Sequence, residues 1–380
     1  MVGMRRRKFI TLLGGAASYF MPPPPLPFGG MQSERGKCLI IVTNRPSAHE
    51  GSAMSIYLRV AMFGTACLGF ICLCAPTSKA QVARTELHAI PTQTLSDRDF
   101  LTGETNGTSV TIAGSLRIPS LGTDRLPAVI LVHGSGGVGG NVDRWSQELN
   151  GIGLATFTID SFTARGLQST SANQALLGRL NMILDSYRAL AVLSTHPRID
   201  PAKIVLMGFS RGGQATLYAS LNRFQRMYGP EGTTFAAYLP FYTPCFTTYI
   251  DDADVSDKPI RLFHGAADDY VPVEPCRPYV ERLRKTGKDV TLTEFPDAHH
   301  AFDNPVIKEG PQPAPQAQTT RRCTLKEEPA GTIINAATKQ PFTMEDPCVE
   351  RGPHVGYNAA ATAASTQAVK EFLRVTLKLN

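Results

Sequence analysis

The sequence predicts an α/β fold in which helices cover both faces of a mainly parallel sheet. Short apolar runs alternate with helix-like segments from Val110 onward, and several runs are apolar at every position, as strands buried on both faces are. No internal repeat interrupts this alternation. Because strands joined through helices pair in parallel with right-handed crossovers, we expect one such domain over residues 81–380.

The expected strands are short and buried. LPAVILVHG covers 126–134 and ends in glycine, and GLATFTID covers 153–160. KIVLMG follows at 203–208, and FAAYLPFY, PIRLFHG and VTLTEFP continue the series. Helices are expected where apolar side chains recur every three or four residues; these segments are 171–195, 211–225, 274–286 and 359–377.

Residues 303–356 depart from this alternation. The segment is rich in Pro and Gly, contains two cysteines and lies between the last strand and the last helix. A connection of about 50 residues without regular structure is unusual in a compact domain. We therefore expect a functional cap or an excursion pinned by a disulfide.

The formal charge of +6 comes from the first 80 residues. They hold nine Lys and Arg against two acidic residues, which leaves 29 basic and 30 acidic residues in 81–380. A body with balanced charge offers no basic excess for nucleic acid, so nucleic acid is not an expected partner.

Residues 54–80 have the pattern of a cleavable signal peptide. A basic residue precedes an apolar stretch at 60–75, and Ser78-Lys79-Ala80 fits the small-x-small rule for cleavage. The stretch is about 16 residues, short of the roughly 20 that a membrane-spanning helix needs. We therefore favour export, with cleavage before Gln81 and a periplasmic or secreted location, over a membrane anchor.

A second leader-like segment lies upstream. Residues 5–17, RRRKFITLLGGAA, resemble a twin-arginine leader and are followed by a run of prolines at 22–25. Two export signals in tandem make little physical sense. We therefore expect translation to start at Met54 and residues 1–53 to be an over-extended or disordered N-terminus.

The segment Gly208-Phe209-Ser210-Arg211-Gly212 follows an expected strand and opens an expected helix. Glycines that flank a serine on a tight strand-to-helix turn are typical of a nucleophile elbow, which projects the hydroxyl above the sheet edge. The helix N-terminus behind the serine favours developing negative charge. The context predicts Ser210 as a nucleophile.

An acid is expected after the strand PIRLF, in the sequence HGAADDYVP. Either Asp268 or Asp269 fits this position, and the spacing to the preceding glycine and to Pro272 favours Asp268. The simpler interpretation of Asp269 is a solvated carboxylate in a turn.

A base is expected after the strand VTLTEF, in the sequence PDAHHAF. Two adjacent histidines cannot both face the serine, and His300, which precedes Ala-Phe, fits better than His299. The order Ser, Asp, His along the chain is the order of the α/β-hydrolase triad. A metal cluster of these histidines with an aspartate is disfavoured, because no other ligand has suitable spacing.

The loop after the first buried strand, His133-Gly134-Ser135-Gly136-Gly137, is in the position that supplies one amide of an oxyanion hole. The residue after the nucleophile supplies the other amide. We therefore expect the backbone N–H groups of Ser135 and Arg211 to be the donors, and His133 to brace the loop.

These stretches, together with IDSFTARG and DPAKIVLMGFSRGG, resemble the dienelactone hydrolase family, and more closely its exported bacterial members with a serine nucleophile. The resemblance implies an α/β-hydrolase fold and hydrolysis of an ester or lactone through an acyl-enzyme. Two positions depart from the dienelactone hydrolases proper, which have cysteine in place of Ser210 and glutamate in place of Gly134. DSFTARG, from Asp160 to Gly166, resembles a family feature near the substrate mouth. Arg165 is a candidate contact for an acidic substrate there, although a structural ion pair is the commoner role of such a residue. Gly136 is a further candidate for contact with the substrate.

Four cysteines in the body predict two disulfides. Cys245 follows FAAYLPFY, and Cys276 lies beyond the loop after PIRLF, so both should lie at the carboxyl edge of neighbouring strands. Cys323 and Cys348 both fall within residues 303–356. We expect the pairs Cys245–Cys276 and Cys323–Cys348, since exported proteins rarely keep free thiols. The cysteine spacing does not suggest zinc.

The sequence thus predicts a serine hydrolase that needs neither a metal nor an organic cofactor and acts on a small ester or lactone. A serine peptidase of the same fold and a catalytically silent binding protein on this scaffold are the alternatives. A membrane-anchored interaction protein is disfavoured by the short apolar stretch.

Overall fold

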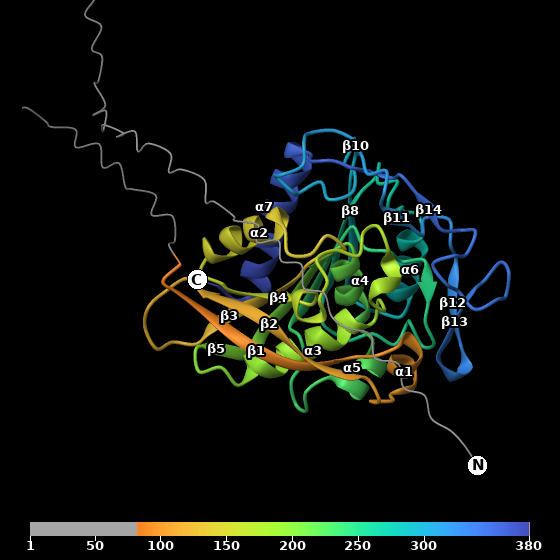
Figure 1. Ribbon diagram of the computed structural model, residues 1–380. Helices are drawn as coiled ribbons and strands as arrows, with labels where there is room; N and C mark the ends of the chain where they lie inside the picture. Colours follow the sequence, from red (N-terminus) through yellow and green to blue (C-terminus); the bar gives the residue numbers. More distant parts are fainter. Residues whose placement is uncertain (1–81, 380) are drawn as a thin grey trace, which may run out of the picture. The chain divides into compact units, whose positions relative to one another are not determined.

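The computed structural model describes residues 82–379. The predicted signal peptide at 54–80 and the segment 1–53 lie outside the described residues. The centre of the domain is an eight-stranded sheet (Figure 1). Its strands, in spatial order, are β1 (Arg84–Thr94), β2 (Thr108–Ile118), β4 (Ala155–Asp160), β3 (Leu126–Val132), β5 (Ile199–Phe209), β6 (Ala237–Phe241), β8 (Ile260–Gly265) and β9 (Val290–Phe295).

The sheet is parallel from β4 to β9, and β1 and β2 extend it as antiparallel strands. Residues 128–132 of β3 are completely buried, and alternate side chains enter the two apolar cores on opposite faces of the sheet. The predicted α/β class with a mainly parallel sheet is confirmed.

Helices cover both faces of this sheet (Figure 1). The core on one face contains apolar residues of α2 (Gly140–Asn150) and α7 (Ala359–Leu377). The core on the other face contains residues of α3, α4, α5 and α6. Their bounds are Asn181–Ser194, Arg211–Tyr218, Asn222–Tyr228 and Cys276–Lys285.

Two expected helices are shorter than the sequence predicts. Residues 171–180 contain only a 3₁₀ turn at Gln174–Leu176, because this stretch crosses the carboxyl edge of the sheet before α3 begins. The segment 211–225 is broken at 219–221, where Leu221 forms a bridge with Val255. The sequence analysis also missed β1, which pairs with β2 over its whole length, together with α2 and the short helix α1 (Asp97–Thr102).

Residues 303–356 form an excursion made of short strand pairs. Its longest strands are β12 (Leu325–Glu328) and β13 (Thr332–Asn335), which form a hairpin whose first strand pairs with β7 (Thr247–Thr248) of the body. The remaining pairs are β10 (Gln312–Pro313) with β15 (His354–Val355) and β11 (Gln318–Thr319) with β14 (Glu350–Arg351).

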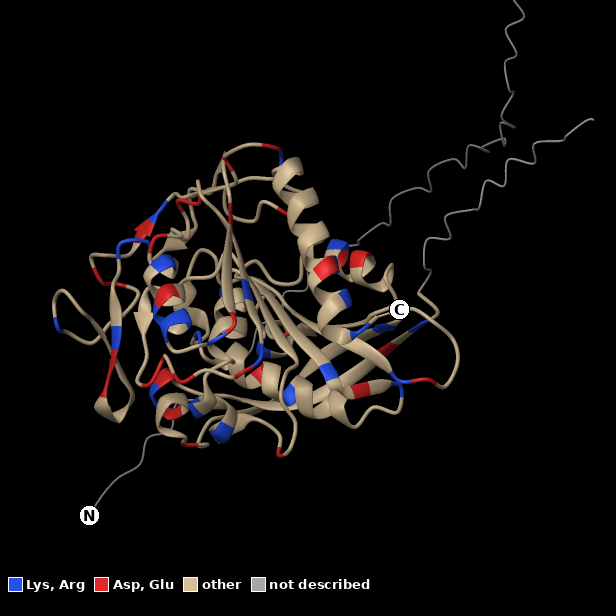
Figure 2. Cartoon of the chain, turned by 180° about the vertical axis from the view of Figure 1, so that it is seen from behind, with Lys and Arg blue, Asp and Glu red and all other residues tan. Residues whose placement is uncertain are grey.

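Acidic and basic residues are interspersed along the described part of the chain in the cartoon of Figure 2. This distribution agrees with the balanced charge of the body. Among residues 82–379, none of the helices combines the length and the apolar character that crossing a membrane requires.

Candidate active site

Ser210 lies at the junction of β5 and α4, with φ 55° and ψ −113°. Positive φ is uncommon for a residue with a side chain, and it is maintained here by the surrounding structure. The amide of Ser210 donates to the carbonyl of Phe241 at 3.0 Å, which ties the turn to β6. The serine side chain therefore stands at the carboxyl edge of the sheet, at the N-terminus of a helix.

The two glycines around Ser210 are required by close backbone contacts. A Cβ on Gly208 would lie 2.1 Å from the carbonyl oxygen of Gly212. A Cβ on Gly212 would lie 2.2 Å from the carbonyl oxygen of Val132 in β3. The turn can pack this tightly against the sheet only when both positions lack a side chain.

His300 links the serine to an acid. Its Nε2 lies 2.9 Å from Ser210 Oγ, and its Nδ1 lies 2.8 Å from Asp268 Oδ2. The side chains of His300 and Asp268 are 5% and 0% exposed, so water competes little for these hydrogen bonds. The structure thus brings together the three residues that the sequence predicts as nucleophile, base and acid.

The two adjacent aspartates have different surroundings. Asp268 Oδ1 accepts the backbone N–H groups of Tyr270 and Val271, which fixes the carboxylate while Oδ2 faces His300. Asp269 instead forms ion pairs with Arg321 and His354 of the excursion. Asp269 is therefore an anchor of the excursion rather than a solvated carboxylate. His299 lines neither of the two cavities beside Ser210.

The loop before α2 lies next to Ser210. Gly134 approaches the serine so closely that a Cβ built on it would be 3.3 Å from Ser210 Cβ. His133 is buried and braces this loop, because its Nδ1 contacts the carbonyl oxygen of Gly134 at 2.7 Å and its Nε2 accepts the N–H of Ser161. Burial lowers the pKa of His133, which favours the neutral ring that these two contacts require.

The comparisons with known proteins identify the family. The model of the dienelactone hydrolase family matches residues 112–377, which is more than half of the chain. The chain belongs to the dienelactone hydrolase family.

The curated proteins that are similar to this chain match only part of its length. The chain is 29% identical over 163 residues to the probable carboxylic ester hydrolase LipM of Mycobacterium tuberculosis, over 32% of this chain and 38% of that protein. It is 32% identical over 104 residues to acyl-protein thioesterase 1 of Gibberella zeae, over 27% of this chain and 43% of that protein. The chain spans less than half the length of these relatives.

Among solved structures, the chain is similar to a dienelactone hydrolase-like promiscuous phosphotriesterase, P91, from metagenomic libraries. The sequence identity is 16% and the TM-score 0.48, over 78% of this chain and 98% of that one.

The family resemblance suggests that Arg165 lies near the substrate, but all N–H groups of its side chain form hydrogen bonds within the protein. Its guanidinium forms a bidentate ion pair with Asp185, and its other contacts go to Ser161, Gln93 and Thr94. These bonds use all five N–H donors of an arginine side chain. The structure therefore shows the structural ion pair that the sequence analysis preferred for Arg165, and these contacts leave no donor for the alternative role in substrate binding.

A cavity of about 220 Å³ opens on one side of Ser210. Gly136, predicted near the substrate, lines it together with His300 and Tyr242.

Tyr242 was missed by the sequence analysis. Its ring lies 4.8 Å from that of His300, and its hydroxyl donates to Asp303 and accepts from Asn141. The burial of Asp303 raises the pKa of this carboxyl.

A second, larger cavity of about 470 Å³ lies beneath the β12–β13 hairpin. A small space beside Ser210 adjoins this cavity, because Gln174, Arg179 and Gln214 line both of them. The chamber wall is largely apolar and is shared by the body and the excursion; it includes Leu95, Leu180, Tyr249, Leu325, Ile333 and Phe342.

The side chain of Arg211 lines the small space beside Ser210, a role that the sequence analysis did not predict. It donates to Thr170 Oγ1, to Gln174 Oε1 and to the carbonyl of Leu177, and so holds the stretch before α3 over the sheet edge. Burial, with the charge of Arg179 nearby, lowers the pKa of Arg211 to about 9.

Both expected disulfides are present, Cys245–Cys276 and Cys323–Cys348. The first joins the segment after β6 to the start of α6, on either side of the loop that carries Asp268. The second closes a loop within the excursion.

Proposed function

We propose that this protein is a serine hydrolase that cleaves a carboxylic ester or lactone through an acyl-enzyme. The observation that carries the proposal is the continuous hydrogen-bonded chain from Ser210 Oγ through His300 to Asp268, at 2.9 and 2.8 Å, on a nucleophile-elbow turn. Membership of the dienelactone hydrolase family and the similarity to ester and thioester hydrolases support the same chemistry.

In the first half-reaction, His300 Nε2 takes the proton of Ser210 while Oγ attacks the carbonyl carbon. Asp268 keeps Nδ1 of His300 protonated and stabilises the imidazolium that forms. The imidazolium then protonates the leaving alcohol oxygen. In the second half-reaction, His300 removes a proton from water, which cleaves the acyl-enzyme and restores the serine.

The oxyanion is proposed to rest on the backbone N–H groups of Ser135 and Arg211. Arg211 is the first residue of α4, so its amide has no acceptor within the helix. Ser135 lines the same cavity as Ser210. Its hydroxyl donates to Gln174 Oε1, so its backbone N–H is the group that we expect to donate to the oxyanion. One such donor contributes on the order of 3 kcal/mol to transition-state stabilisation.

A fluorophosphonate probe tests this function directly. We expect stoichiometric labelling of Ser210, located by peptide mapping, and a pre-steady-state burst of p-nitrophenol from p-nitrophenyl acetate. Labelled protein should lose its esterase activity. Absence of both labelling and turnover would favour a silent binding protein, and cleavage of peptides in preference to esters and lactones would favour the peptidase.

We also propose that the protein is exported, with Gln81 as the first mature residue. The two disulfides support an oxidising compartment. N-terminal sequencing of protein from its native host tests the proposal, and a mature peptide from residues 1–53 would contradict it.

A further inference from the structure

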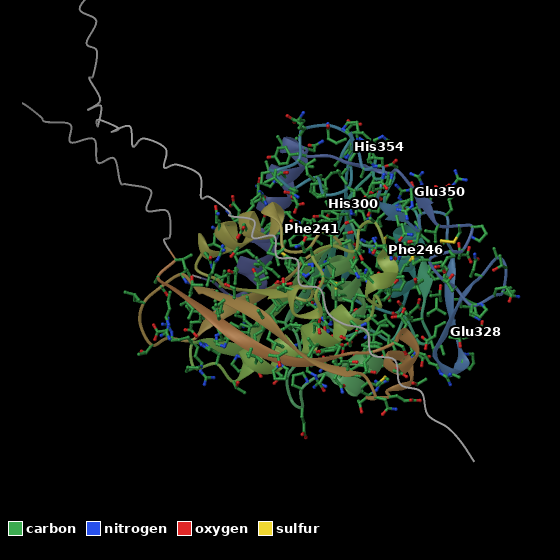
Figure 3. The ribbon with its side chains drawn as sticks, viewed as in Figure 1. Phe241, Phe246, His300, Glu328, Glu350 and His354 are labelled. Carbon is green, nitrogen blue, oxygen red and sulfur yellow. A yellow bond between two sulfur atoms is a disulfide. The ribbon has the colours of Figure 1, made fainter. Side chains whose placement is uncertain are left out.

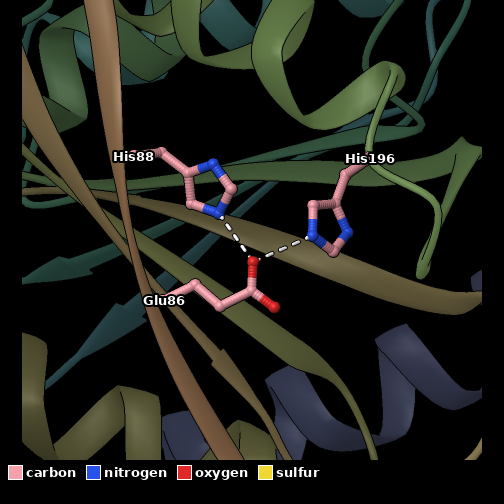
Figure 4. Close-up of side chains that lie close together, drawn as sticks. All are labelled: Glu86, His88 and His196. Atoms are coloured by element: carbon pink, nitrogen blue, oxygen red, sulfur yellow. Dashed lines mark hydrogen bonds and ion pairs between the residues drawn. The ribbon is translucent and has the colours of Figure 1, made fainter.

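A cluster of three side chains of types that bind metals lies beside β1 and does not include any of the residues around Ser210. Glu86 and His88 are two positions apart on this strand, so their side chains leave it on the same face. His196, from the turn between α3 and β5, meets them there. Nε2 of His88 and Nε2 of His196 each lie 3.1 Å from Glu86 Oε2 (Figure 4).

The spacing of these atoms matches a metal site. The three ligand atoms all lie within 4.8 Å of one another. Ligands that are about 2.0–2.1 Å from a tetrahedral zinc ion are roughly 3.3 Å from each other. The two nitrogen–oxygen separations of 3.1 Å are already close to this value. Small shifts of the two rings would therefore admit an ion between them.

The surroundings hold the rings but leave an approach for solvent. The ring of His88 packs edge-on against Phe157 and against His196, with centroids 5.8 and 5.5 Å apart. The side chains of His88, Glu86 and His196 are 22%, 16% and 9% exposed, so an ion could enter and keep a water ligand.

We propose that Glu86, His88 and His196 bind one divalent transition-metal ion, with Zn²⁺ as the representative ion. Two imidazoles with a carboxylate suit zinc and its neighbours, whereas Mg²⁺ and Ca²⁺ require oxygen ligands. The ion takes the place of the two Nε2 protons that the histidines now direct at Glu86, and in each neutral ring this proton moves from Nε2 to Nδ1. In His196 the move ends the hydrogen bond that Nδ1 now accepts from the N–H of Arg198 at 3.2 Å.

The site has a structural consequence. His196 is 110 residues from Glu86 along the chain, and an ion would join the edge strand β1 to the turn that leads into β5. Cross-links that close long loops remove much entropy from the unfolded chain. The ion thus fastens the edge of the sheet and takes no part in ester hydrolysis.

Zinc binding to the untagged full-length chain tests the proposal. The measured quantity is the difference in bound zinc between wild type and the double variant His88→Gln/His196→Gln in equilibrium dialysis, because this difference cancels any zinc that other groups of the chain bind. We expect one equivalent less in the double variant. His354→Gln is the matched control, since His354 is also a partly exposed histidine 2.9 Å from a carboxylate; it should bind as much zinc as wild type.

Thermal melting supplies a second measurement. At a hundredfold excess of Zn²⁺ over Kd, the Tm of wild type should rise by about 5 °C, and Mg²⁺ should not change it. Glu86→Gln keeps the shape of the side chain but loses the anionic ligand, so it should bind more than about tenfold more weakly even if the double variant does not fold. Equal zinc counts and equal Tm shifts in wild type, Glu86→Gln and the double variant would overturn the proposal.

Discussion

The body of the domain and the excursion at 303–356 are stabilised in different ways. Apolar side chains on both faces of the sheet hold the body, and they include the largest buried rings of the protein. The excursion contributes only a small apolar cluster around Cys323 and Leu325. A disulfide, ion pairs and backbone hydrogen bonds hold it instead.

The excursion nevertheless contacts both loops that carry the predicted acid and base. Thr319 donates to the carbonyl of Tyr270, next to the aspartates, and the N–H of Gly356 donates to the carbonyl of His300. His354 and Glu350 lie on the same side of the molecule as His300 (Figure 3). The body therefore carries the proposed catalytic residues, and the excursion contacts the loops of two of them and forms part of the wall of the larger cavity.

The largest expected effect comes from the body. Ser210→Ala should lower kcat for p-nitrophenyl acetate by about 10⁶-fold, because no other group takes over the attack. The melting temperature should stay near that of wild type, since the residue is small and only partly buried. Activity of the purified variant at the wild-type level would show that Ser210 is not the nucleophile.

The adjacent aspartates allow the two regions to be compared, because Asp268 contacts His300 of the body and Asp269 contacts the excursion. Asp268→Asn should lower kcat by about 10⁴-fold, because the amide favours the wrong tautomer of His300. Asp269→Asn should keep kcat within about tenfold while it weakens the contacts with Arg321 and His354. Steady-state kinetics of both variants check this, and the reverse order would exchange the roles of the two carboxylates.

The disulfides extend the comparison to stability. Cys323→Ser/Cys348→Ser should cost about 3 kcal/mol, confined to local opening of the excursion. Limited proteolysis within 303–356 should then speed up by about two orders of magnitude at an almost unchanged melting temperature. The matched variant Cys245→Ser/Cys276→Ser should instead lower the melting temperature, because that bridge is buried in the body. Equal effects of the two pairs would remove the distinction.

The sequence allowed more of the body than of the excursion to be predicted. Three local patterns marked the candidate site: strand ends that are followed by Gly-x-Ser-x-Gly, by an aspartate or by a histidine. The structure brings the three side chains that these patterns picked out into contact. The partners of Arg165 and the network from Tyr242 to Asp303 depend on contacts between distant segments. Local periodicity carries no information on such contacts, and the same holds for the wall that the β12–β13 hairpin gives to the larger cavity.

The smallest expected effect is a pH dependence of the excursion. Although burial raises the pKa of Asp269, hydrogen bonds from His354 and the charge of Arg321 outweigh it and hold the pKa below its ordinary value of 3.8. A carboxyl with a lowered pKa in the folded state stabilises that state fully above the unfolded value, and this contribution is lost as pH falls through the folded value.

Hydrogen exchange of peptides from 312–356 measures this effect between pH 3 and 6, after correction for the intrinsic rate. Wild type should lose protection below about pH 4, and Asp269→Asn should show less protection at pH 6 but a flatter decline toward pH 3. The side chain is 38% exposed, so solvent screening keeps the difference small. Peptides from β3 and β5 serve as the internal reference, because their amides report on the core of the body. A decline of the same slope in both proteins would mean that the excursion is held mainly by its disulfide and backbone hydrogen bonds, and that Asp269 contributes little.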